Sequence, residues 1–177
     1  VFVAEGVEES ILSLPEASKI AITCSTRRDG LGRSLELAEK LTEMGFQIVP
    51  HIPARSISDD GKNGYLKELL EHLCSLGVRE IFIPGGDRKK PLGLFSSAYE
   101  LLYALDEIRH NFEEVGIAGY PEGHPSISDD VLLKSLKEKA PFSTYIVTQM
   151  CFDSNAIIKW VEQIRNEGIN LPVYVGI

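Results

Sequence analysis

The chain has 177 residues, 44% of them hydrophobic, so it is long enough to bury a sizeable core and falls within the usual size of one domain. Its net charge of −8 argues against nucleic acid or an anionic membrane surface as a partner. The three cysteines, Cys24, Cys74 and Cys151, lie far apart, which argues against a disulfide framework, and no metal site is expected.

No apolar run is long enough to cross a bilayer, and we expect no signal peptide before Val1. We therefore expect a soluble, cytoplasmic protein with neither nucleic acid nor a membrane as its partner.

Strand and helix patterns alternate along the whole chain. Runs of β-branched and apolar residues predict strands over residues 1–4, 19–23, 46–51, 78–84, 115–119, 144–148 and 172–177. Apolar residues at helical spacing predict helices over residues 34–44, 65–76, 95–109, 131–139 and 155–167. Gly45, Gly77 and Gly168 are each followed by an apolar residue, as is typical of helix C-caps. A unit of one strand and one helix thus recurs roughly every 30 residues, the length of a βαβ crossover.

Parallel strands joined by helices form either a doubly wound sheet or a barrel. The predicted strand ends favour the barrel, because polar groups follow many of them: Thr23, His51, Asp87, the segment 120–124 and Gln149. We predict an α/β fold with a single domain over residues 1–177. This domain is a (β/α)8 TIM-type barrel or a fragment of one, with about six to seven β/α units present. Its open edges at 1–4 and 172–177 predict a homo-oligomer or part of a longer polypeptide.

The segment Ile81–Asp87 reads as a buried strand that ends in a glycine turn. Gly85 and Gly86 let the backbone bend or approach a ligand, and Asp87 presents a carboxylate at the carboxyl end of the strand. That edge carries the chemistry in parallel α/β folds. Arginines and lysines in loops after the strands could hold a phosphate, although most are expected to be solvated: Arg27, Arg28, Arg55, Arg88, Lys89 and Lys90.

Two further strand ends carry distinctive residues. In the segment 116–125, prolines stiffen a loop that holds Tyr120 and His124, although an ordinary structural turn is an equally good interpretation. In the segment 147–153, the amide of Gln149 both donates and accepts, which suits the edge of a pterin or a flavin, or else caps a neighbouring loop. His51 is either a ligand contact or a structural group.

Taken together, these elements resemble the methylenetetrahydrofolate reductase family. The similarity lies in an ordered set of motifs and extends over nearly the whole chain from about Ile20. The motifs are His51, Gly86-Asp87, the segment 118–125 (AGYPEGHP), Thr148-Gln149 with Phe152-Asp153, and the helical segment Leu136–Lys139.

The resemblance implies a flavoprotein that binds FAD at the carboxyl-terminal mouth of its barrel. NADH or NADPH delivers a hydride to the flavin, which passes it to the methylene carbon of 5,10-methylenetetrahydrofolate and gives 5-methyltetrahydrofolate. By the same resemblance Asp87 lies beside the flavin and the pterin, Glu5 is the acid toward the folate nitrogen, and Gln149 binds the pterin. The residues implied to bind FAD are Thr23, His51, Gly86, Asp87, Ala118, Tyr120, His124 and Lys139.

The chain also departs from the family pattern. Gly85 stands in place of an arginine, Leu132 in place of an aspartate and Ser97 in place of a tyrosine, while the segment 24–28 replaces a glycine-rich stretch. These differences leave two alternatives open. One is a folate- or flavin-binding barrel without reductase activity, and the other is a folate one-carbon enzyme that uses no flavin.

Overall fold

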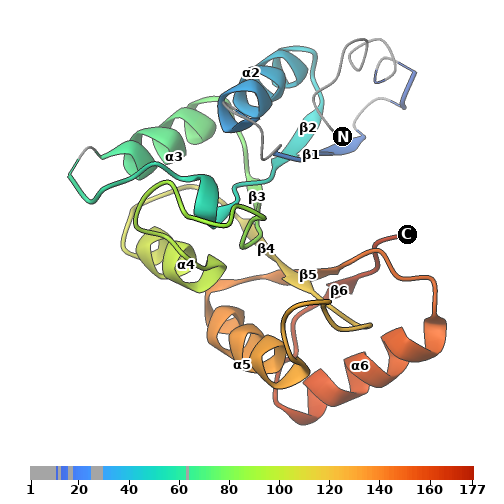
Figure 1. Ribbon diagram of the computed structural model, residues 1–177. Coiled ribbons are helices and arrows are strands. Elements are labelled where there is room, and N and C mark those ends of the chain that lie inside the picture. The colour runs from blue at the N-terminus through green and yellow to red at the C-terminus, as the bar shows by residue number, and fades with distance from the viewer. Residues whose placement is uncertain (1–10, 12, 16–17, 25–29, 63) are drawn as a thin grey trace. The chain divides into compact units, whose positions relative to one another are not determined.

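The structure is a computed structural model that describes residues 11, 13–15, 18–24, 30–62 and 64–177. The chain divides into two compact units, Val1–Glu113 and Glu114–Ile177, here called unit 1 and unit 2. Short strands alternate with helices in both units, as the ribbon shows (Figure 1). The strand predicted over residues 1–4 lies outside the described residues.

Three parallel strands organise unit 1. β1 (Lys19–Ile22) pairs with β2 (Gln47–Pro50), so that Ile22 lies opposite Pro50. β3 (Glu80–Ile83) runs beside the end of β2, because His51 forms a parallel bridge with Phe82 and the Ile52 N–H donates to the Phe82 carbonyl at 2.8 Å. The helical elements of this unit are α2 (Gly30–Glu43), η1 (Ala54–Ser56), α3 (Tyr65–Ser75) and α4 (Ala98–Asp106).

The helices of unit 1 bury one face each. The buried leucines of α3, for example, recur at intervals of three and four residues, which places them on one side of the helix. Each fully buried leucine contributes about 2 kcal/mol. The side chains buried in this way are Leu31, Leu37 and Leu41 of α2, Leu66, Leu69, Leu70 and Leu73 of α3, and Leu101, Leu102 and Leu105 of α4.

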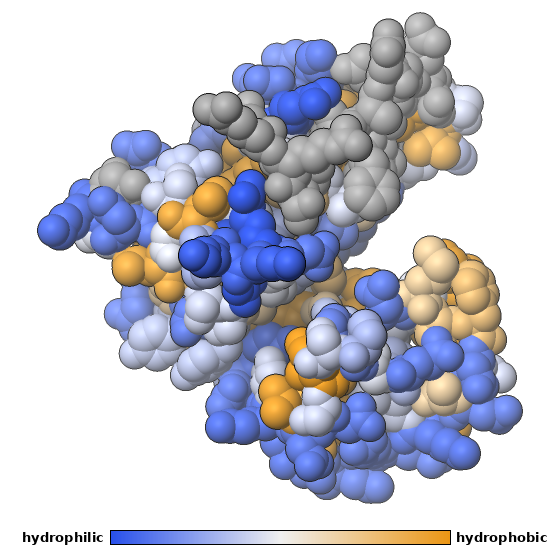
Figure 2. All heavy atoms as spheres, viewed as in Figure 1, coloured by the Kyte–Doolittle hydropathy of each residue, from blue (hydrophilic) through white to orange (hydrophobic). Residues whose placement is uncertain are grey.

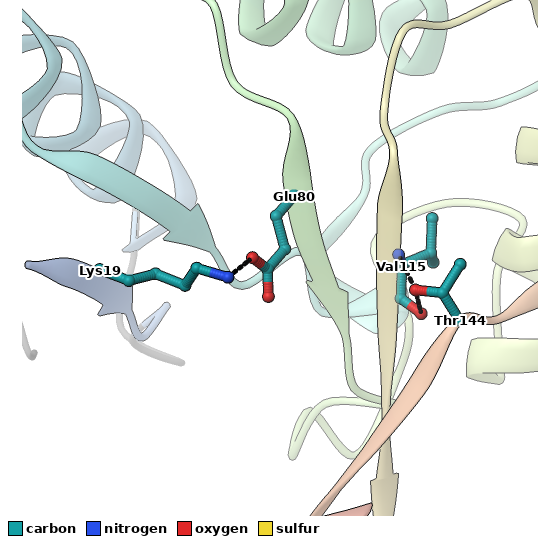
Figure 3. Close-up of polar contacts among 4 residues, drawn as sticks. All are labelled: Lys19, Glu80, Val115 and Thr144. Atoms are coloured by element: carbon teal, nitrogen blue, oxygen red, sulfur yellow. Dashed lines mark hydrogen bonds and ion pairs between the residues drawn. The ribbon is translucent and has the colours of Figure 1, made fainter. Parts of the chain in front are cut away.

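An ion pair joins β1 to β3 at the edge of unit 1 (Figure 3). The Lys19 ammonium lies 2.5 Å from a carboxylate oxygen of Glu80. The Lys19 side chain is 52% exposed, so solvent screens the pair and its contribution to stability is at most about 1 kcal/mol.

Unit 2 is also built on parallel strands. β4 (Glu114–Gly119) pairs with β5 (Tyr145–Thr148), which pairs with β6 (Val173–Tyr174). Thr144 is hydrogen-bonded to Val115 where the pairing of β4 with β5 begins (Figure 3). Its Oγ1 accepts the Val115 N–H at 2.8 Å, and its own N–H donates to the Val115 carbonyl at 2.9 Å. The helical elements are α5 (Asp129–Lys139), η2 (Ala140–Phe142) and α6 (Ser154–Asn166).

Two glycines of β4 make room for aromatic rings. A Cβ on Gly116 would lie 2.3 Å from the ring of Tyr145, and a Cβ on Gly119 would lie 2.5 Å from the indole of Trp160 on α6. Glycine inside a strand often marks such a close approach. These two glycines therefore serve the packing of the sheet against aromatic rings.

The alternation of helices and parallel strands confirms the predicted α/β class. The predicted C-caps are confirmed as well, because Gly45, Gly77 and Gly168 have φ of +88°, +79° and +83°. The predicted boundaries at 95 and 177 were wrong. α4 starts only after Ser97, whose hydroxyl accepts the Glu100 N–H at 3.3 Å as an N-cap, and β6 is two residues long.

The surface drawn in Figure 2 is mainly hydrophilic, with separate hydrophobic areas between the polar ones. None of the helices in the described part of the chain combines the length and the apolar character that a membrane span requires.

Candidate functional site

The described site residues that the sequence predicts are divided between the two units. Unit 1 holds Thr23, His51, Gly86 and Asp87, which follow its three strands. Unit 2 holds Ala118, Tyr120, His124, Lys139 and Gln149. The predicted acid, Glu5, lies outside the described residues.

In unit 1, Thr23 and His51 leave adjacent strands at the same edge. The His51 N–H donates to the Ile22 carbonyl at 2.9 Å, so the two strand ends are hydrogen-bonded neighbours. The imidazole of His51 packs against Phe82, with ring centroids 4.7 Å apart. Burial lowers the pKa of His51 to about 4, so the ring is neutral at neutral pH. A neutral imidazole offers one donor and one acceptor to a ligand and adds no charge.

The loop after β3 turns at Gly86 and presents Asp87. Gly86 has a φ of +90°, and a Cβ at this position would lie 2.9 Å from the Cβ of Pro53. Gly85 has no positive φ, and a Cβ there would meet nothing within 4 Å. Of the two glycines predicted to shape this turn, Gly86 is the one that the backbone requires. Asp87 is exposed, and its carboxylate has no hydrogen bond or ion pair within the described part of the chain.

In unit 2, the ends of β4 and β5 bring two predicted contacts to one edge. The Gln149 N–H donates to the Gly119 carbonyl at 2.7 Å, so Tyr120 and Gln149 leave neighbouring strands. The rings of Tyr120 and His124 meet edge to face, with centroids 5.5 Å apart. Nδ1 of His124 accepts the Ser126 N–H at 3.2 Å, which leaves Nε2 to carry the proton of the neutral ring.

Lys139, the last residue of α5, is the buried cation of unit 2. The residue is 7% exposed, and burial lowers the pKa of its ammonium group to about 8. No carboxylate or carbonyl oxygen among the described residues pairs with this group. Partial removal from water makes the charged form of this lysine less favourable, and an ammonium group without a protein partner is suited to an anionic ligand.

Sequence reasoning named Arg55 and Thr148 but missed the hydrogen bonds by which they hold the site in place. The guanidinium group of Arg55 donates to the carbonyls of Lys89 and Ser96 in the loop after β3, at 2.7 and 3.3 Å. The buried hydroxyl of Thr148 accepts the Gly176 N–H at 2.9 Å beside Gln149. No local pattern indicates the role of Arg55, because its partners lie 34 and 41 residues away. Within the described ranges, no group of three or more acidic, histidine or cysteine side chains is arranged to hold a metal ion.

The chain matches known proteins along most of its length. The family model described as methylenetetrahydrofolate reductase matches residues 10–177. Methylenetetrahydrofolate reductase 1 of Schizosaccharomyces pombe is 34% identical over 144 residues, which cover 77% of this chain and 23% of that protein.

Two further relatives are named after different nicotinamides. A probable methylenetetrahydrofolate reductase (NADPH) of Caenorhabditis elegans is 32% identical over 117 residues, covering 61% of this chain and 17% of that protein. Methylenetetrahydrofolate reductase (NADH) 1 of Arabidopsis thaliana is 29% identical over 126 residues, covering 61% and 21%. The chain therefore spans less than a quarter of the length of these three relatives. The match over residues 10–177 confirms the resemblance seen in the motifs: the chain belongs to the methylenetetrahydrofolate reductase family.

Proposed function

We propose that this protein reduces 5,10-methylenetetrahydrofolate to 5-methyltetrahydrofolate with NADH or NADPH, with FAD bound at the mouth of a (β/α)8 barrel. Family membership supports the reaction, and the names of the relatives support a reduced nicotinamide as the electron donor. Parallel strand pairs in both units, with predicted site residues such as His51 and Gln149 at their carboxyl ends, support the barrel.

The observation that carries FAD binding is the unpaired ammonium of Lys139. A diphosphate is a dianionic group with which a buried lysine can form an ion pair, and that pair would raise the pKa of the side chain back toward its ordinary value. Tyr120 and His124 form an aromatic pair in the same unit, and we assign them to the ribityl or adenine part of the cofactor. Ala118 lies in β4, one residue before Gly119, and contributes strand backbone to this side of the proposed site.

The remaining residues are assigned to the flavin ring and the folate. The neutral His51, with Thr23 and Gly86, is compatible with an uncharged ring system. Asp87 offers an unpaired carboxylate, and Gln149 offers an amide that can match a pterin edge. The chemistry supplied by a bound FAD is the relay of a hydride from the nicotinamide to the methylene carbon. We assign the role of acid toward the folate nitrogen to Glu5.

The test is a visible spectrum of the purified protein titrated with FAD, for the wild type and for Asp87→Asn. We expect the flavin bands to shift on binding, to bleach with a reduced nicotinamide and to recover when methylenetetrahydrofolate is added. Asp87→Asn should bind FAD, but its flavin bands should recover more slowly than those of the wild type. Asp106→Asn, which removes an exposed carboxylate at the end of α4, should behave as the wild type.

Two results would contradict the proposal. A folded protein that binds no flavin excludes the FAD-dependent reaction, and folate turnover by such a colourless protein indicates a flavin-independent one-carbon enzyme. A protein that binds folate or flavin but transfers no hydride is a binding protein without reductase activity.

A further inference from the structure

We propose that Arg55 is a positioning residue that fixes the loop carrying Asp87. The loop, residues 84–97, leaves the end of β3 and leads to α4. The proposal deepens the proposed function, since it rests on the assignment of Asp87 to the reacting part of the site. The contacts that support it all lie within unit 1.

The side chain of Arg55 ties together two distant points of this loop. Its Nη2 donates to the Lys89 carbonyl at 2.7 Å, and its Nη1 donates to the Ser96 carbonyl at 3.3 Å. A planar guanidinium group can reach two acceptors at once in a fixed geometry, whereas a lysine ammonium is a single flexible point of contact. The two carbonyls lie on either side of the loop's middle, so the arginine closes the loop upon itself.

The backbone of Arg55 holds the same loop at further points. Its N–H donates to the Gly85 carbonyl at 3.1 Å, and its carbonyl accepts the Leu92 N–H at 3.1 Å. Ala54, the preceding residue, donates to the Pro84 carbonyl at 3.0 Å. The Gly85 contact lies two residues before Asp87, so Arg55 contacts the loop both before and after the carboxylate.

The surroundings of Arg55 explain how one side chain can fix the loop. Its Nε is buried without a hydrogen-bond partner among the described residues, which means that the stem of the side chain is packed while the Nη groups make the contacts. The tight approach of Gly86 to Pro53 brings the backbone of the loop against the segment that carries Arg55. Loss of the guanidinium should therefore loosen the loop around Lys89 and Ser96, while the backbone hydrogen bonds at Gly85 and Leu92 remain.

The first test measures opening of the loop with Lys-C, a protease that cuts after lysine. The bond after Lys89 is its target in the loop, because Pro91 blocks the bond after Lys90. Arg55→Met keeps an apolar stem, removes both donors and changes no lysine. We expect cleavage after Lys89 to become about tenfold faster, since two hydrogen bonds of ordinary net strength are lost.

Matched variants show whether the effect belongs to Arg55. Arg79→Met removes an exposed arginine of the same unit that also donates to a carbonyl, that of Asn111, and it should leave the cleavage rate unchanged. Arg55→Gln keeps one amide donor and should give an intermediate rate. Unchanged cleavage in both Arg55 variants, or an equal rise in Arg79→Met, would overturn the proposal. Thermal melting of each variant separates loosening of the loop from unfolding of the protein.

The second test asks whether Arg55 acts through Asp87. The rate at which methylenetetrahydrofolate reoxidises the reduced protein is measured for Arg55→Met, Asp87→Asn and the double variant. If Arg55 acts by positioning the Asp87 carboxylate, removing Arg55 should have no further effect once that carboxylate is absent. The double variant should then be reoxidised no more slowly than Asp87→Asn. Losses that multiply would overturn the proposal. If the protein performs no flavin chemistry at all, the proposed function fails, while the Lys-C result still decides whether Arg55 holds the loop.

Discussion

Units 1 and 2 each remove basic side chains from water, and they compensate for it in different ways. In unit 1, Arg55 gives its Nη groups to two loop carbonyls, and His51 remains neutral. In unit 2, Lys139 is buried more deeply than either and has no partner among the described residues. Unit 1 thus pairs the guanidinium group of Arg55 within the protein and keeps His51 uncharged. Unit 2 holds a lysine whose burial destabilises the protein, and we expect a bound anion to relieve that cost.

The largest effect expected from this contrast is that of Lys139→Met. The pKa of Lys139 falls from 10.5 to about 8, so the charged form destabilises the fold at all pH values below about 8, and this cost disappears as the pH rises from 8 to 10.5. At pH 7 we expect the substitution to raise the free energy of unfolding of the flavin-free protein by about 3 kcal/mol. Urea unfolding measures this change.

The same variant should lower the affinity for FAD by about a hundredfold, because a charge-assisted contact is lost. Lys134→Met, on the exposed face of the same helix, is the control and should change neither stability nor affinity by a measurable amount. A variant that is less stable than the wild type and binds FAD equally well would show that Lys139 serves the fold rather than a ligand.

The second prediction concerns His51, which adapts to burial by releasing its proton. The unfolded chain binds this proton near pH 6.5 and the folded protein only near pH 4, so the stability conferred is complete above pH 6.5 and is lost as the pH falls toward 4. The loss should reach about 3 kcal/mol across that range. His51→Gln should not show this pH-dependent loss. The free energy of unfolding is measured against pH for the wild type and for His51→Gln, and subtracting one curve from the other removes the contribution of the carboxylates. A difference that is constant with pH would contradict the prediction.

A third substitution tests how strictly the loop that Arg55 holds is constrained. Gly86→Ala places a side chain at a φ of +90° and a Cβ 2.9 Å from that of Pro53, which should cost about 2 kcal/mol of stability. Gly85→Ala is the matched control, because its Cβ would meet nothing within 4 Å, and should change stability by less than about 0.5 kcal/mol. Equal losses in the two variants would mean that the turn requires both glycines.

The smallest effect is expected at Thr148 in unit 2, where backbone pairing with β4 and β6 holds the strand whatever the side chain. Thr148→Val keeps the shape and leaves the Gly176 N–H without its acceptor, at a cost of about 1 kcal/mol. Hydrogen exchange at the Gly176 amide should accelerate in Thr148→Val and stay slow in Thr148→Ser, which retains the hydroxyl. Fast exchange in both variants would show that the hydroxyl is not what protects this amide.

The sequence predicted those features that depend on neighbouring residues. Strand and helix patterns, the left-handed caps such as Gly45, and the ordered motifs around Asp87 and Gln149 are local properties, so they can be read without coordinates. The start of α4 was missed because the capping hydroxyl of Ser97 begins the helix three residues later than the apolar periodicity suggested. The capping residue itself is visible in the sequence.

What escaped prediction depends on contacts between distant segments. The role of Arg55 requires the loop that follows β3 to lie over it, and the difference between Gly85 and Gly86 requires Pro53 to lie beneath the turn. Lys139 follows its helical pattern as an ordinary last-turn lysine, and only tertiary burial distinguishes it. The site residues could therefore be proposed from motifs, whereas their burial, their hydrogen-bond partners and the shifts in their pKa could not be predicted.

The packing of Trp160 against Gly119 gives unit 2 an optical reporter of its own. Trp160 is the single tryptophan of the chain, and the glycine it covers accepts the hydrogen bond that fixes Gln149. Its fluorescence therefore originates one residue away from the edge to which we assign the pterin. Quenching of that emission by an added folate would follow occupancy of this edge directly, in a protein with no cofactor and no turnover.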